Sequence, residues 1–511
     1  MKTSRVRSDR VAVATATTTY NRLYGQVFNG CPRRTPQRPG RLRSSPMPSS
    51  TRRMGWAPVL LAVGLLFSGC AKSQRHLYSS MKDTETATQL RQFVAEKIAQ
   101  ADASTNEPAP GFAPFFAAAK KGDWLAVSNC FNELRQHAGQ YQQSGATDER
   151  LRGTRWAAVM EVLGAFEAFG GGDEKYAAAF GRDVLASIPP GSIYFGGTDP
   201  GRFVVTAMCR SQVNGDPIFV LTQNALADGG YLDYLRQMYG SKLYIPSNDD
   251  LQRCFEDYTT DLQKRRQNHE LKPGEDFKLD ANGHVQVSGQ IGVMAINGLL
   301  AKVIFDKNPD HEFYLEESFP LDWMYPQLEP HGLIIKINQQ PRATLPDEVV
   351  QADHDYWAKY VQPIIGDWLK DETPVATVAE FGEKTFGRQD FKDFQGDRHF
   401  IQNTYAHRMF SKLRSSIGGL YAWRVNQPGE GADKERMARA ADFAFRQAWA
   451  LCPYSPEAVY RYVNFLVAQD RTDDALMVAE TTAKLPQSKG NAQIKQLVSS
   501  LKQMHGKKPP A

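Results

Sequence analysis

Cysteine is scarce in this sequence, and its spacing argues against a metal site. The 511 residues include six cysteines, none of them in a Cys-x-x-Cys pair. Structural zinc and iron–sulfur sites take their ligands from closely spaced cysteines or histidines, so we expect no metal. Four cysteines lie well beyond the amino-terminal region: Cys130, Cys209, Cys254 and Cys452. Buried free thiols are the favoured interpretation for these four, and one disulfide in an oxidising compartment is the alternative.

Signatures of common catalytic and nucleotide-binding sites are also missing. The sequence contains no Gly-x-Ser-x-Gly, no His-Glu-x-x-His and no phosphate-binding loop. Its glycine-rich stretch 196–201, GGTDPG, lacks the spacing of a dinucleotide-binding loop. The adjacent residues 353–355, Asp-His-Asp, cannot easily share one ion, because neighbouring side chains on a helix point about 100° apart. We therefore expect no cofactor, and the sequence favours a non-enzymatic protein without excluding an enzyme.

A strong excess of one charge is absent from most of the chain. The formal net charge is +5, but residues 1–53 contain eleven arginines and Lys2 against a single acid, Asp9. Residues 54–511 therefore hold 49 basic and 55 acidic side chains, a balance of −6. Nucleic-acid binding needs a basic face on the folded part, so we expect no nucleic-acid partner. Hydrophobic residues make up 41% of the chain, enough for sizeable cores.

No apolar run is long enough to cross a membrane, but a short one stands before a cysteine. Residues 57–67, APVLLAVGLLF, form a run of 11, whereas a spanning helix needs about 20. Arg52 and Arg53 precede the run, and Ser68-Gly69-Cys70 follows it. A basic segment, a short apolar segment and small residues in this order are typical of a signal peptide.

This segment resembles the lipobox of bacterial lipoproteins. In that family the cysteine thiol takes a diacylglycerol and becomes the new amino terminus after cleavage. The resemblance implies that Cys70 carries lipid, that residues 47–69 are the signal peptide, and that the protein is exported to the cell envelope and held there by acyl chains. Phe67 departs from the family, where Leu is usual. The alternative is an ordinary signal peptide or short anchor in which Cys70 is incidental.

The segments around this signal show no periodic pattern. Residues 1–46 are rich in Arg, Ser and Pro, and we interpret them as a non-native extension of the start. Residues 70–83 are predicted to be a polar tether. From 84 to 172 the chain is predicted to be helical, because apolar residues recur at helical spacing over 84–101, 112–138 and 154–169, with a break near Gly122-Asp123. Helices in this order predict α-hairpins.

Residues 173–397 change to an alternating pattern. Short apolar runs at 192–195, 217–222 and 242–245 alternate with helical stretches, and further strands are predicted at 285–287 and 332–337. Ser247 and Asp250 are spaced as a capping box at the start of one helix. The alternation predicts a Rossmann-like parallel or mixed sheet with covering helices. The fold class expected for the whole chain is thus α/β plus α, with helical regions on both sides of the sheet.

The last region, 398–511, is predicted to be helical over 399–425, 434–451, 456–468 and 472–485. It resembles tetratricopeptide repeats. Ala441, Phe445, Ala448 and Pro453 have the spacing of the second helix of that repeat, and Ala475 follows Ala441 by the repeat length of 34 residues. Small residues at these places let two helices pack closely. An ordinary helical hairpin is the alternative.

Three stretches of the middle region carry a further resemblance: IPPGSIYFGGTDPGRFVVTAMC, PIFVLTQNALADGGYLDYLRQMYG and FYLEESFPLDWMYPQLEPHGLIIKIN. Over about 175–425 the chain is similar to the soluble domain of bacterial protein O-mannosyltransferase-like membrane proteins. In that family a multi-spanning region carries the expected transfer chemistry, and this sequence contains no such region, so the activity is not carried over. The resemblance implies the fold, an envelope location and a role in glycan or surface-protein handling.

Candidate ligand-binding residues follow from the expected topology. Ligands of open α/β sheets bind beyond the carboxyl ends of the strands. Six residues follow the first two predicted strands and are candidates to line one crevice: Gly196, Gly197, Thr198, Asp199, Asn224 and Asp228. Two acids there would suit sugar hydroxyls or a cation. The alternative is structural, with Asp199 as a helix cap before Pro200 and Asp228 in a turn. Glu316-Glu317 and the nearby aromatics Tyr314, Trp323 and Tyr325 suggest either a carbohydrate platform or, as favoured, a loop packed on the sheet.

Two hypotheses for function remain open. The favoured one is a membrane-anchored interaction scaffold, in contact with the membrane through its lipid and with other envelope proteins through the carboxyl-terminal repeats. The alternative is a sugar-binding module or glycosyl-transfer-related enzyme that uses the Asp199/Asp228 crevice. The scaffold is favoured because a repeat pattern is visible in the sequence and a catalytic constellation is not.

Overall fold

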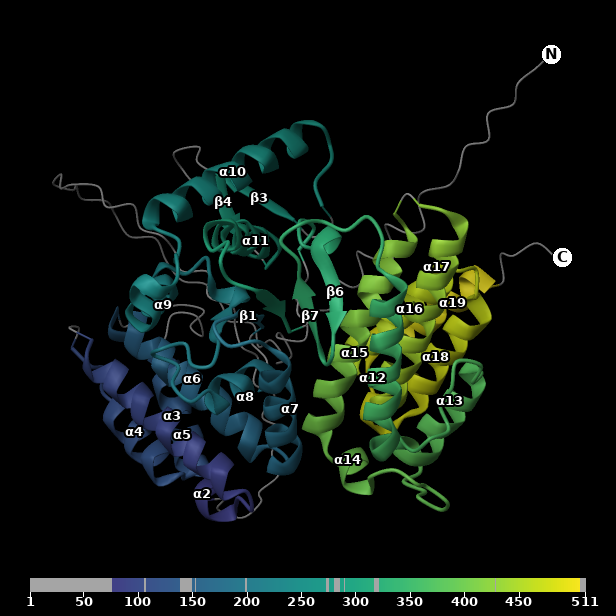
Figure 1. Ribbon diagram of the computed structural model, residues 1–511, viewed down its shortest axis with the longest axis horizontal. Helices are drawn as coiled ribbons and strands as arrows, with labels where there is room; N and C mark the ends of the chain where they lie inside the picture. Colours follow the sequence, from purple (N-terminus) through teal and green to yellow (C-terminus); the bar gives the residue numbers. More distant parts are fainter. Residues whose placement is uncertain are drawn as a thin grey trace, which may run out of the picture.

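A computed structural model describes residues 76–505 apart from 105–106, 138–148, 152, 198–199, 273–274, 280–284, 289, 317–320 and 428. The predicted signal peptide and Cys70 therefore lie outside the described residues. Amino-terminal helices occupy one side of the molecule, a small sheet lies in the middle, and carboxyl-terminal helices occupy the other side (Figure 1). The described residues are mostly helical, in agreement with the α/β plus α class.

Most of the amino-terminal helices form where apolar periodicity predicts them. The helices of this region are α2 (Leu77–Ser80), α3 (Thr84–Asp102), α4 (Phe112–Lys121), α5 (Trp124–His137), α6 (Gly153–Gly170) and α7 (Glu174–Ser187), with a 3-10 turn at Glu149–Leu151. However, α2 lies in the segment 70–83 predicted to be a polar tether, and Leu77 and Tyr78 bind the turn after α4. Gly122 ends α4 with a φ of 73°, which accounts for the predicted break. α6 is apolar on nearly all sides and packs against α3, α5, α8 and α9, so it is the central helix of this half.

The sheet has five strands in the order β2-β1-β5-β7-β6. Its strands are β1 (Ile193–Gly196), β2 (Phe219–Thr222), β5 (Phe313–Leu315), β6 (Leu328–His331) and β7 (Ile334–Ile337). β1 is parallel to both β2 and β5, while β7 is antiparallel to β5 and β6. The prediction of adjacent parallel strands at 192–195 and 217–222 is confirmed. Every residue of β1, β2 and β5 is buried, as expected for parallel strands covered on both faces.

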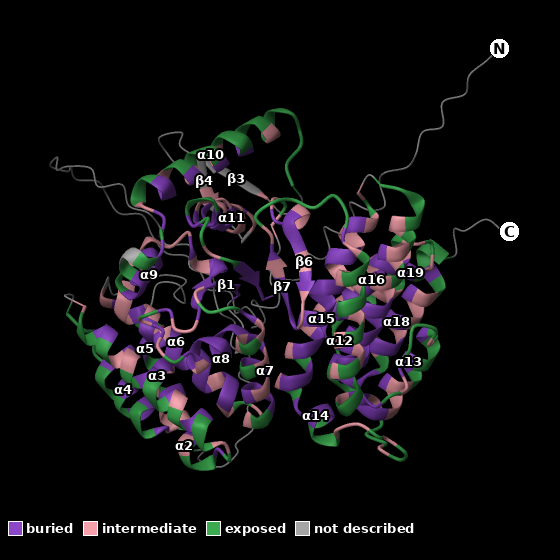
Figure 2. Ribbon diagram, viewed as in Figure 1, coloured by how far each residue is buried: buried purple, intermediate pink, exposed green. Residues whose placement is uncertain are grey.

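The covering helices of this region are α8 (Pro200–Met208), α9 (Gly229–Tyr239), α10 (Asn248–Gln267), α11 (Gln290–Lys307) and α12 (Asp347–Ile365), with 3-10 turns at Gln223–Ala225, Gly240–Lys242 and Tyr325–Gln327. The capping box at the start of α10 is confirmed, since both Ser247 and Asp250 make their reciprocal bonds. α8 and α9 pack against α6, so one hydrophobic core runs from the amino-terminal helices to the sheet (Figure 2).

The strand predicted at 242–245 is wrong. Leu243 has an extended backbone, but the N–H of Tyr244 donates to Asn308 Oδ1 at 2.8 Å and its carbonyl accepts from Asn308 Nδ2 at 3.1 Å. One side-chain amide thus takes the place of a neighbouring strand. The strand predicted at 285–287 exists as β4 (Val285–Ser288), but it pairs with β3 (Asp276–Leu279) in a separate hairpin. The sequence does not predict β5, because three apolar residues between polar ones give too weak a pattern.

The carboxyl-terminal helices are α13 (Val375–Phe381), which continues into a π-helical turn at Gly382–Gly387, then α14 (Arg398–Gln402), α15 (Thr404–Val425), α16 (Gly431–Leu451), α17 (Pro456–Ala468), α18 (Thr472–Lys484) and α19 (Ala492–His505), with a 3-10 turn at Pro486–Ser488. Consecutive helices from α15 to α19 pack against one another. The helix predicted over 399–425 is broken at Asn403, whose side chain accepts from Ala406 N–H and caps α15.

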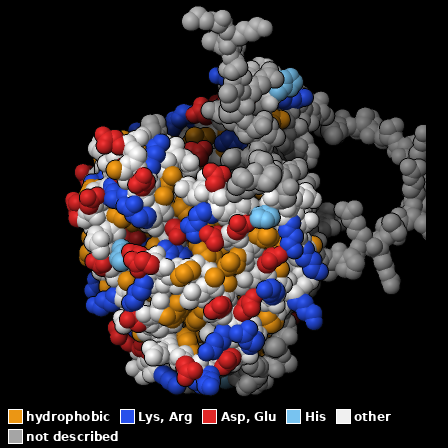
Figure 3. Space-filling model, turned by 90° about the vertical axis from the view of Figure 1, so that its right-hand side faces the viewer, with side chains coloured by type: hydrophobic (Ala, Val, Ile, Leu, Met, Phe, Trp, Pro, Cys, Tyr) orange, Lys and Arg blue, Asp and Glu red, His pale blue; other side chains and the backbone are white. Residues whose placement is uncertain are grey.

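The carboxyl-terminal helices are also joined to the middle of the molecule. α12 and α13 pack on α16, and α13 packs on α18. Arg424 of α15 is buried and donates to the carbonyl of Leu328 in β6 at 3.0 Å and to that of Arg342 at 3.0 Å. The outer face of these helices carries hydrophobic side chains scattered among lysines, arginines and acids (Figure 3). No helix within the described ranges is both long enough and apolar enough to span a membrane.

Candidate functional site

The carboxyl ends of β1, β2 and β5 meet at one edge of the sheet, where the sequence predicts a crevice. Gly197 N–H donates to Glu316 Oε2 at 3.2 Å, which joins the ends of β1 and β5. A Cβ at Gly196 would lie 2.1 Å from Arg202 Cγ, and one at Gly201 would lie 2.4 Å from Glu316 Oε1. The glycines are therefore needed because the Glu316 carboxylate and the Arg202 stem approach the backbone closely.

The end of β2 brings Asn224 to the same edge. Asn224 is 4% exposed, and its Oδ1 has no hydrogen-bond partner among the described residues. Its backbone carbonyl accepts from Asn297 Nδ2 at 3.0 Å, and Asn297 Oδ1 accepts from Ala227 N–H at 2.7 Å. Asn297, on α11, therefore holds the loop after β2 in place. A buried acceptor without a partner costs about 1–3 kcal/mol, so such an atom marks a place where a ligand or a water would bind.

Of the two acids predicted to line the crevice, the structure describes Asp228 but not Asp199. Asp228 is the N-cap of α9, and its Oδ1 accepts from Gly230 N–H at 2.9 Å. The structural alternative predicted for Asp228 is a turn, whereas the structure makes it a helix cap, and a ligand role stays a prediction. Thr198 and Asp199 lie outside the described residues. Of the predicted crevice, Gly196, Gly197 and Asn224 come together at the sheet edge, and Glu316 joins them as a member not in the predicted set.

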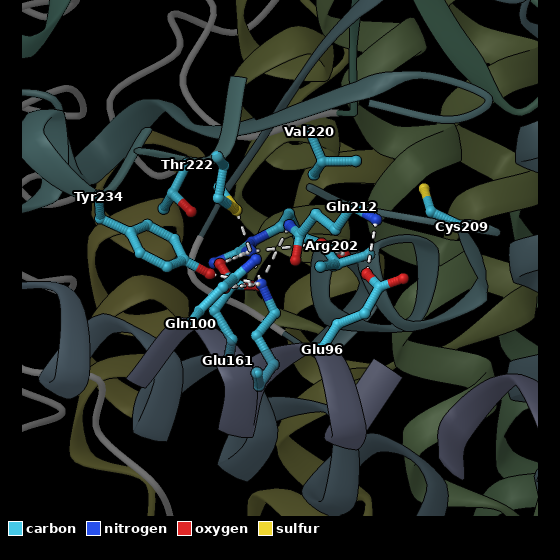
Figure 4. A network of polar contacts seen from close by, with 12 residues as sticks. Glu96, Gln100, Glu161, Arg202, Cys209, Gln212, Val220, Thr222 and Tyr234 are labelled. Carbon is cyan, nitrogen blue, oxygen red and sulfur yellow. Dashed lines mark hydrogen bonds and ion pairs between the residues drawn. The ribbon is translucent and has the colours of Figure 1, made fainter. Parts of the chain in front are cut away.

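Below this edge lies a buried polar cluster, the Lys97 cluster, whose members come from four helices and one loop (Figure 4). It consists of Lys97, Gln100, Glu161, Arg202, Gln212 and Tyr234. Arg202 Nη1 donates to Glu161 Oε1 at 2.7 Å, and Gln212 Nε2 donates to Glu161 Oε2 at 3.3 Å. Lys97 Nζ donates to Gln100 Oε1 at 3.2 Å and to the Tyr234 hydroxyl.

The Lys97 cluster contains two cationic side chains, Lys97 and Arg202, and one anionic side chain, Glu161, and all three are buried. Burial lowers the pKa of Lys97, the Glu161 charge opposes this change and the Arg202 charge adds to it, so that the pKa is about 8. Burial disfavours the Glu161 carboxylate, but the charges of Arg202 and Lys97 outweigh burial and lower its pKa. Burial and the Glu161 charge raise the pKa of Tyr234. The cluster is therefore charged near neutral pH and holds α3, α6, α8 and α9 together.

Arg202 connects the cluster to the sheet edge. Its stem lies against Gly196, and its guanidinium pairs with Glu161. Thr222, the last residue of β2, lies beside the cluster (Figure 4), and its Oγ1 has no hydrogen-bond partner among the described residues. A signal for this cluster exists in the sequence. Lys97 stands on the apolar face of α3 one turn after Phe93, and Glu161 interrupts an otherwise apolar α6. Charged residues on a buried face are seldom left unpaired.

The three side chains of the Asp-His-Asp stretch at 353–355 do not converge on one point. Asp353 is buried, and both of its oxygens accept from Arg414 Nη1, at 3.0 and 2.8 Å. Tyr421 donates to it at 2.9 Å. His354 instead contacts Asp355 and Asp371. Within the described residues no group of three or more His, Cys, Asp or Glu is placed to hold a metal ion. The four cysteines 130, 209, 254 and 452 are free thiols.

The aromatic residues near Glu316 do not share one platform. Tyr314 donates to Glu312 at 2.7 Å, and Trp323 Nε1 donates to the Gly298 carbonyl at 3.1 Å. Tyr325 stacks on Trp423 of α15 with ring centroids 5.1 Å apart. Each ring is thus packed on a different element. This arrangement favours the interpretation that the segment is packed on the sheet over that of a sugar-stacking surface.

Four of the five residues predicted to pack the repeats lie inside the carboxyl-terminal helices, and Pro453 lies buried in the turn between α16 and α17. Ala441, Phe445, Ala448 and Ala475 are at most 1% exposed. The Ala448 carbonyl accepts from Ser411 Oγ of α15 at 2.7 Å, and the Pro453 carbonyl accepts from Thr482 Oγ1 of α18 at 2.8 Å. A Cβ at Gly418 would lie 2.8 Å from the Phe445 ring. Small residues therefore stand at close helix–helix contacts.

None of the comparisons identifies a relative: no protein-family model, no curated protein and no solved structure matches the chain.

The function must therefore be inferred from the geometry alone. The described site has one carboxylate, Glu316, against backbone N–H, one buried amide oxygen without a partner among the described residues, and a charged cluster whose members are buried. Sequence reasoning missed Glu316 as an edge residue because the sequence pattern does not predict β5. It missed Arg202 because one arginine at the start of an amphipathic helix is usually exposed.

Proposed function

We propose that the protein is a scaffold of the cell envelope, anchored to a membrane by an acylated Cys70 and presenting tetratricopeptide-like helices to other envelope proteins. The observation that carries the proposal is that buried charged side chains pair with other segments of the same chain. Most of the conspicuous buried charges bind another segment of the same chain, so they serve the architecture of the molecule.

Two buried ion pairs illustrate this use. Arg202 and Glu161 join α8 to α6, and Arg414 and Asp353 join α15 to α12. Both pairs are nearly inaccessible, and each is completed by further hydrogen bonds from Gln212 or Tyr421. Removing one partner of such a pair is strongly destabilising, by about 3–5 kcal/mol. A molecule that commits its buried charges in this way holds distant helices in fixed positions, which suits a scaffold.

The surface offered to partners is the end of the molecule formed by α18 and α19. Leu476, Met477, Leu497 and Val498 are half-buried there, and Met504 is 39% exposed. Charged side chains lie among the apolar ones on this side of the molecule (Figure 3). A mixed surface of this kind is typical of protein interfaces that form and dissociate. Helical repeats present such surfaces along their stacked helices.

Site-specific photo-crosslinking in cells tests the proposal. A photoreactive residue replaces Met504 or Leu497 on α19, and a third variant carries it at the exposed Gln263 of α10, on another side of the molecule (Figure 1). We expect the same discrete adduct from both α19 positions and no such adduct from Gln263. Absence of an adduct at both α19 positions, or identical adducts at all three positions, would contradict a scaffold that binds through these helices.

The sheet edge supports a second candidate, a sugar-binding module or glycosyl-transfer-related enzyme. Its supporting observation is Asn224 Oδ1, a buried acceptor without a partner among the described residues, beside the Gly197–Glu316 contact. A sugar hydroxyl would donate to this oxygen. The resemblance to the soluble domain of O-mannosyltransferase-like proteins points to the same ligand class. A thermal-shift screen with monosaccharides and divalent cations tests the candidate with wild type, Asn224→Leu, Asp199→Asn and Asp228→Asn. A ligand that stabilises only the wild type would favour the module over the scaffold.

A further inference from the structure

The position where the chain joins the folded body is firmly fixed. Leu77 N–H donates to the Gly122 carbonyl at 2.8 Å, and His76 forms a bridge with Asp123. The Tyr78 hydroxyl donates to the Ala119 carbonyl at 2.8 Å. Gly122 leaves room for the Tyr78 ring, which a Cβ would approach to 2.6 Å. The first described residues are therefore bound to the turn between α4 and α5.

A lipid on Cys70 would bring this turn close to the membrane, so the orientation of the molecule at the bilayer rests on the proposed anchor. Six peptide units separate Cys70 from His76, and an extended chain spans at most about 3.5 Å per residue, or roughly 20 Å. A folded body of about 430 residues has a radius of gyration of roughly 22 Å and a diameter of more than twice that value. The stretch from Cys70 to His76 is thus shorter than the diameter of the body. Only the end of the molecule that contains α2 and the α4–α5 turn can therefore lie at the bilayer.

The side chains at this end suit a lipid headgroup region. Leu125 is 48% exposed, which places it among the few large apolar side chains at the described surface, and Trp124 is half-buried against Gly170. Lys120 and Lys121 are exposed in the last turn of α4. Lysines with long stems and an aromatic residue beside an apolar one are typical of surfaces that lie in the membrane interface.

Three acids near this end bind other parts of the chain. Asp123 caps α5 by accepting from Ala126 N–H at 3.0 Å, and Asp83 pairs with Arg182 at 2.6 Å. Glu174 accepts from Lys82 N–H at 3.3 Å. Lys120 and Lys121 are exposed and carry positive charges that suit an anionic surface.

We infer that Lys120, Lys121, Trp124 and Leu125, here called the tether-side surface, lie on the bilayer and bind anionic phospholipid headgroups. The lipid anchor then holds the molecule in one orientation. α2 and the α4–α5 turn face the membrane, and α10 with the β3–β4 hairpin lies at the far end (Figure 1). The α18–α19 surface is left to the side, accessible to a partner in the same envelope layer.

Depth-dependent fluorescence quenching tests the orientation on the acylated full chain. A fluorescent amino acid replaces Leu125 in one preparation and Gln263 in another, and each protein is bound to vesicles that contain lipids with nitroxide-labelled headgroups. In vesicles with phosphatidylglycerol we expect quenching at position 125 to be at least about threefold stronger than at position 263. Lys120→Glu with Lys121→Glu should lower the quenching at 125, because each lysine near an anionic surface contributes about fivefold in affinity.

Two controls separate the orientation from the proposed function. Lys264→Glu with Arg266→Glu, on exposed positions of α10, should leave the quenching at 125 unchanged. Mass spectrometry of the same preparation reports whether Cys70 carries acyl chains. Acylated protein with equal quenching at 125 and 263, or with no dependence on phosphatidylglycerol, would overturn the orientation and leave the anchor intact. Protein without acyl chains on Cys70 would overturn the anchor, and the orientation falls with it.

Discussion

The lowered pKa of Lys97 makes the stability of the folded protein depend on pH. This pKa is about 8 in the folded protein, compared with 10.5 ordinarily. Between these values the unfolded chain holds a proton that the folded protein has lost, so the free energy of unfolding rises with pH across the window. The shift corresponds to about 3 kcal/mol over the whole window. Denaturant unfolding at pH 7.5, 9 and 10 measures this rise, and Lys97→Met should flatten it. An unchanged slope in Lys97→Met would assign the effect to another group.

Glu167 makes the free energy of unfolding depend on pH with the opposite sign, in a different pH range. It lies on α6, and burial raises its pKa from 4.5 to about 7. Between these values the folded protein holds a proton that the unfolded chain has lost, so the free energy of unfolding falls as pH rises. Glu167→Gln should remove this fall and stabilise the protein at pH 8 by up to about 3 kcal/mol. Glu133→Gln, on an exposed position of α5, is the matched control and should change little.

At the scale of the helix, the alanines of the carboxyl-terminal pairs allow a sharp test. Ala441 and Ala475 are 0% exposed. Ala441→Glu or Ala475→Glu would bury a carboxylate without a partner, which costs several kcal/mol. Limited proteolysis should then cut the chain beyond about residue 425. Ala468→Glu, at an exposed position of α17, should leave the protein resistant. If both variants stayed fully resistant to the protease, the repeat interpretation of these two alanines would be wrong.

Prediction of single elements succeeds where local chemistry is decisive. The sequence predicts a helix over 174–187, and α7 has these bounds, because Asp173 caps its first turn and apolar residues repeat on one face. The predicted bounds of α17 also match, because Pro456 starts this helix. The failure at 242–245 has a non-local cause. The sequence around Tyr244 favours an extended chain, and only the distant Asn308 decides that a side chain, not a strand, pairs with it.

For the whole molecule, the anchor yields the most direct test. Cys70→Ser should abolish metabolic palmitate labelling and move the protein from the membrane fraction to the soluble fraction, because the acyl chains would supply most of the affinity for the bilayer. Cys130→Ser, which changes a half-buried free thiol, is the control and should leave both results as in wild type. Labelled protein that stays in the membrane fraction of Cys70→Ser would refute the lipid attachment.

The sequence by itself determined the local features of this protein. Apolar periodicity and capping residues depend on neighbours within one or two turns, so most helices, the parallel pair β1–β2 and the buried alanines of the last helices follow from the sequence. Only the tertiary structure decided which distant residues meet. The place of β5 beside β1, the pairing of Arg202 with Glu161 and the place of Glu316 beside Gly197 depend on contacts across 41 to 120 residues. Such contacts leave no periodic trace, because packing and desolvation, not chain neighbours, select them.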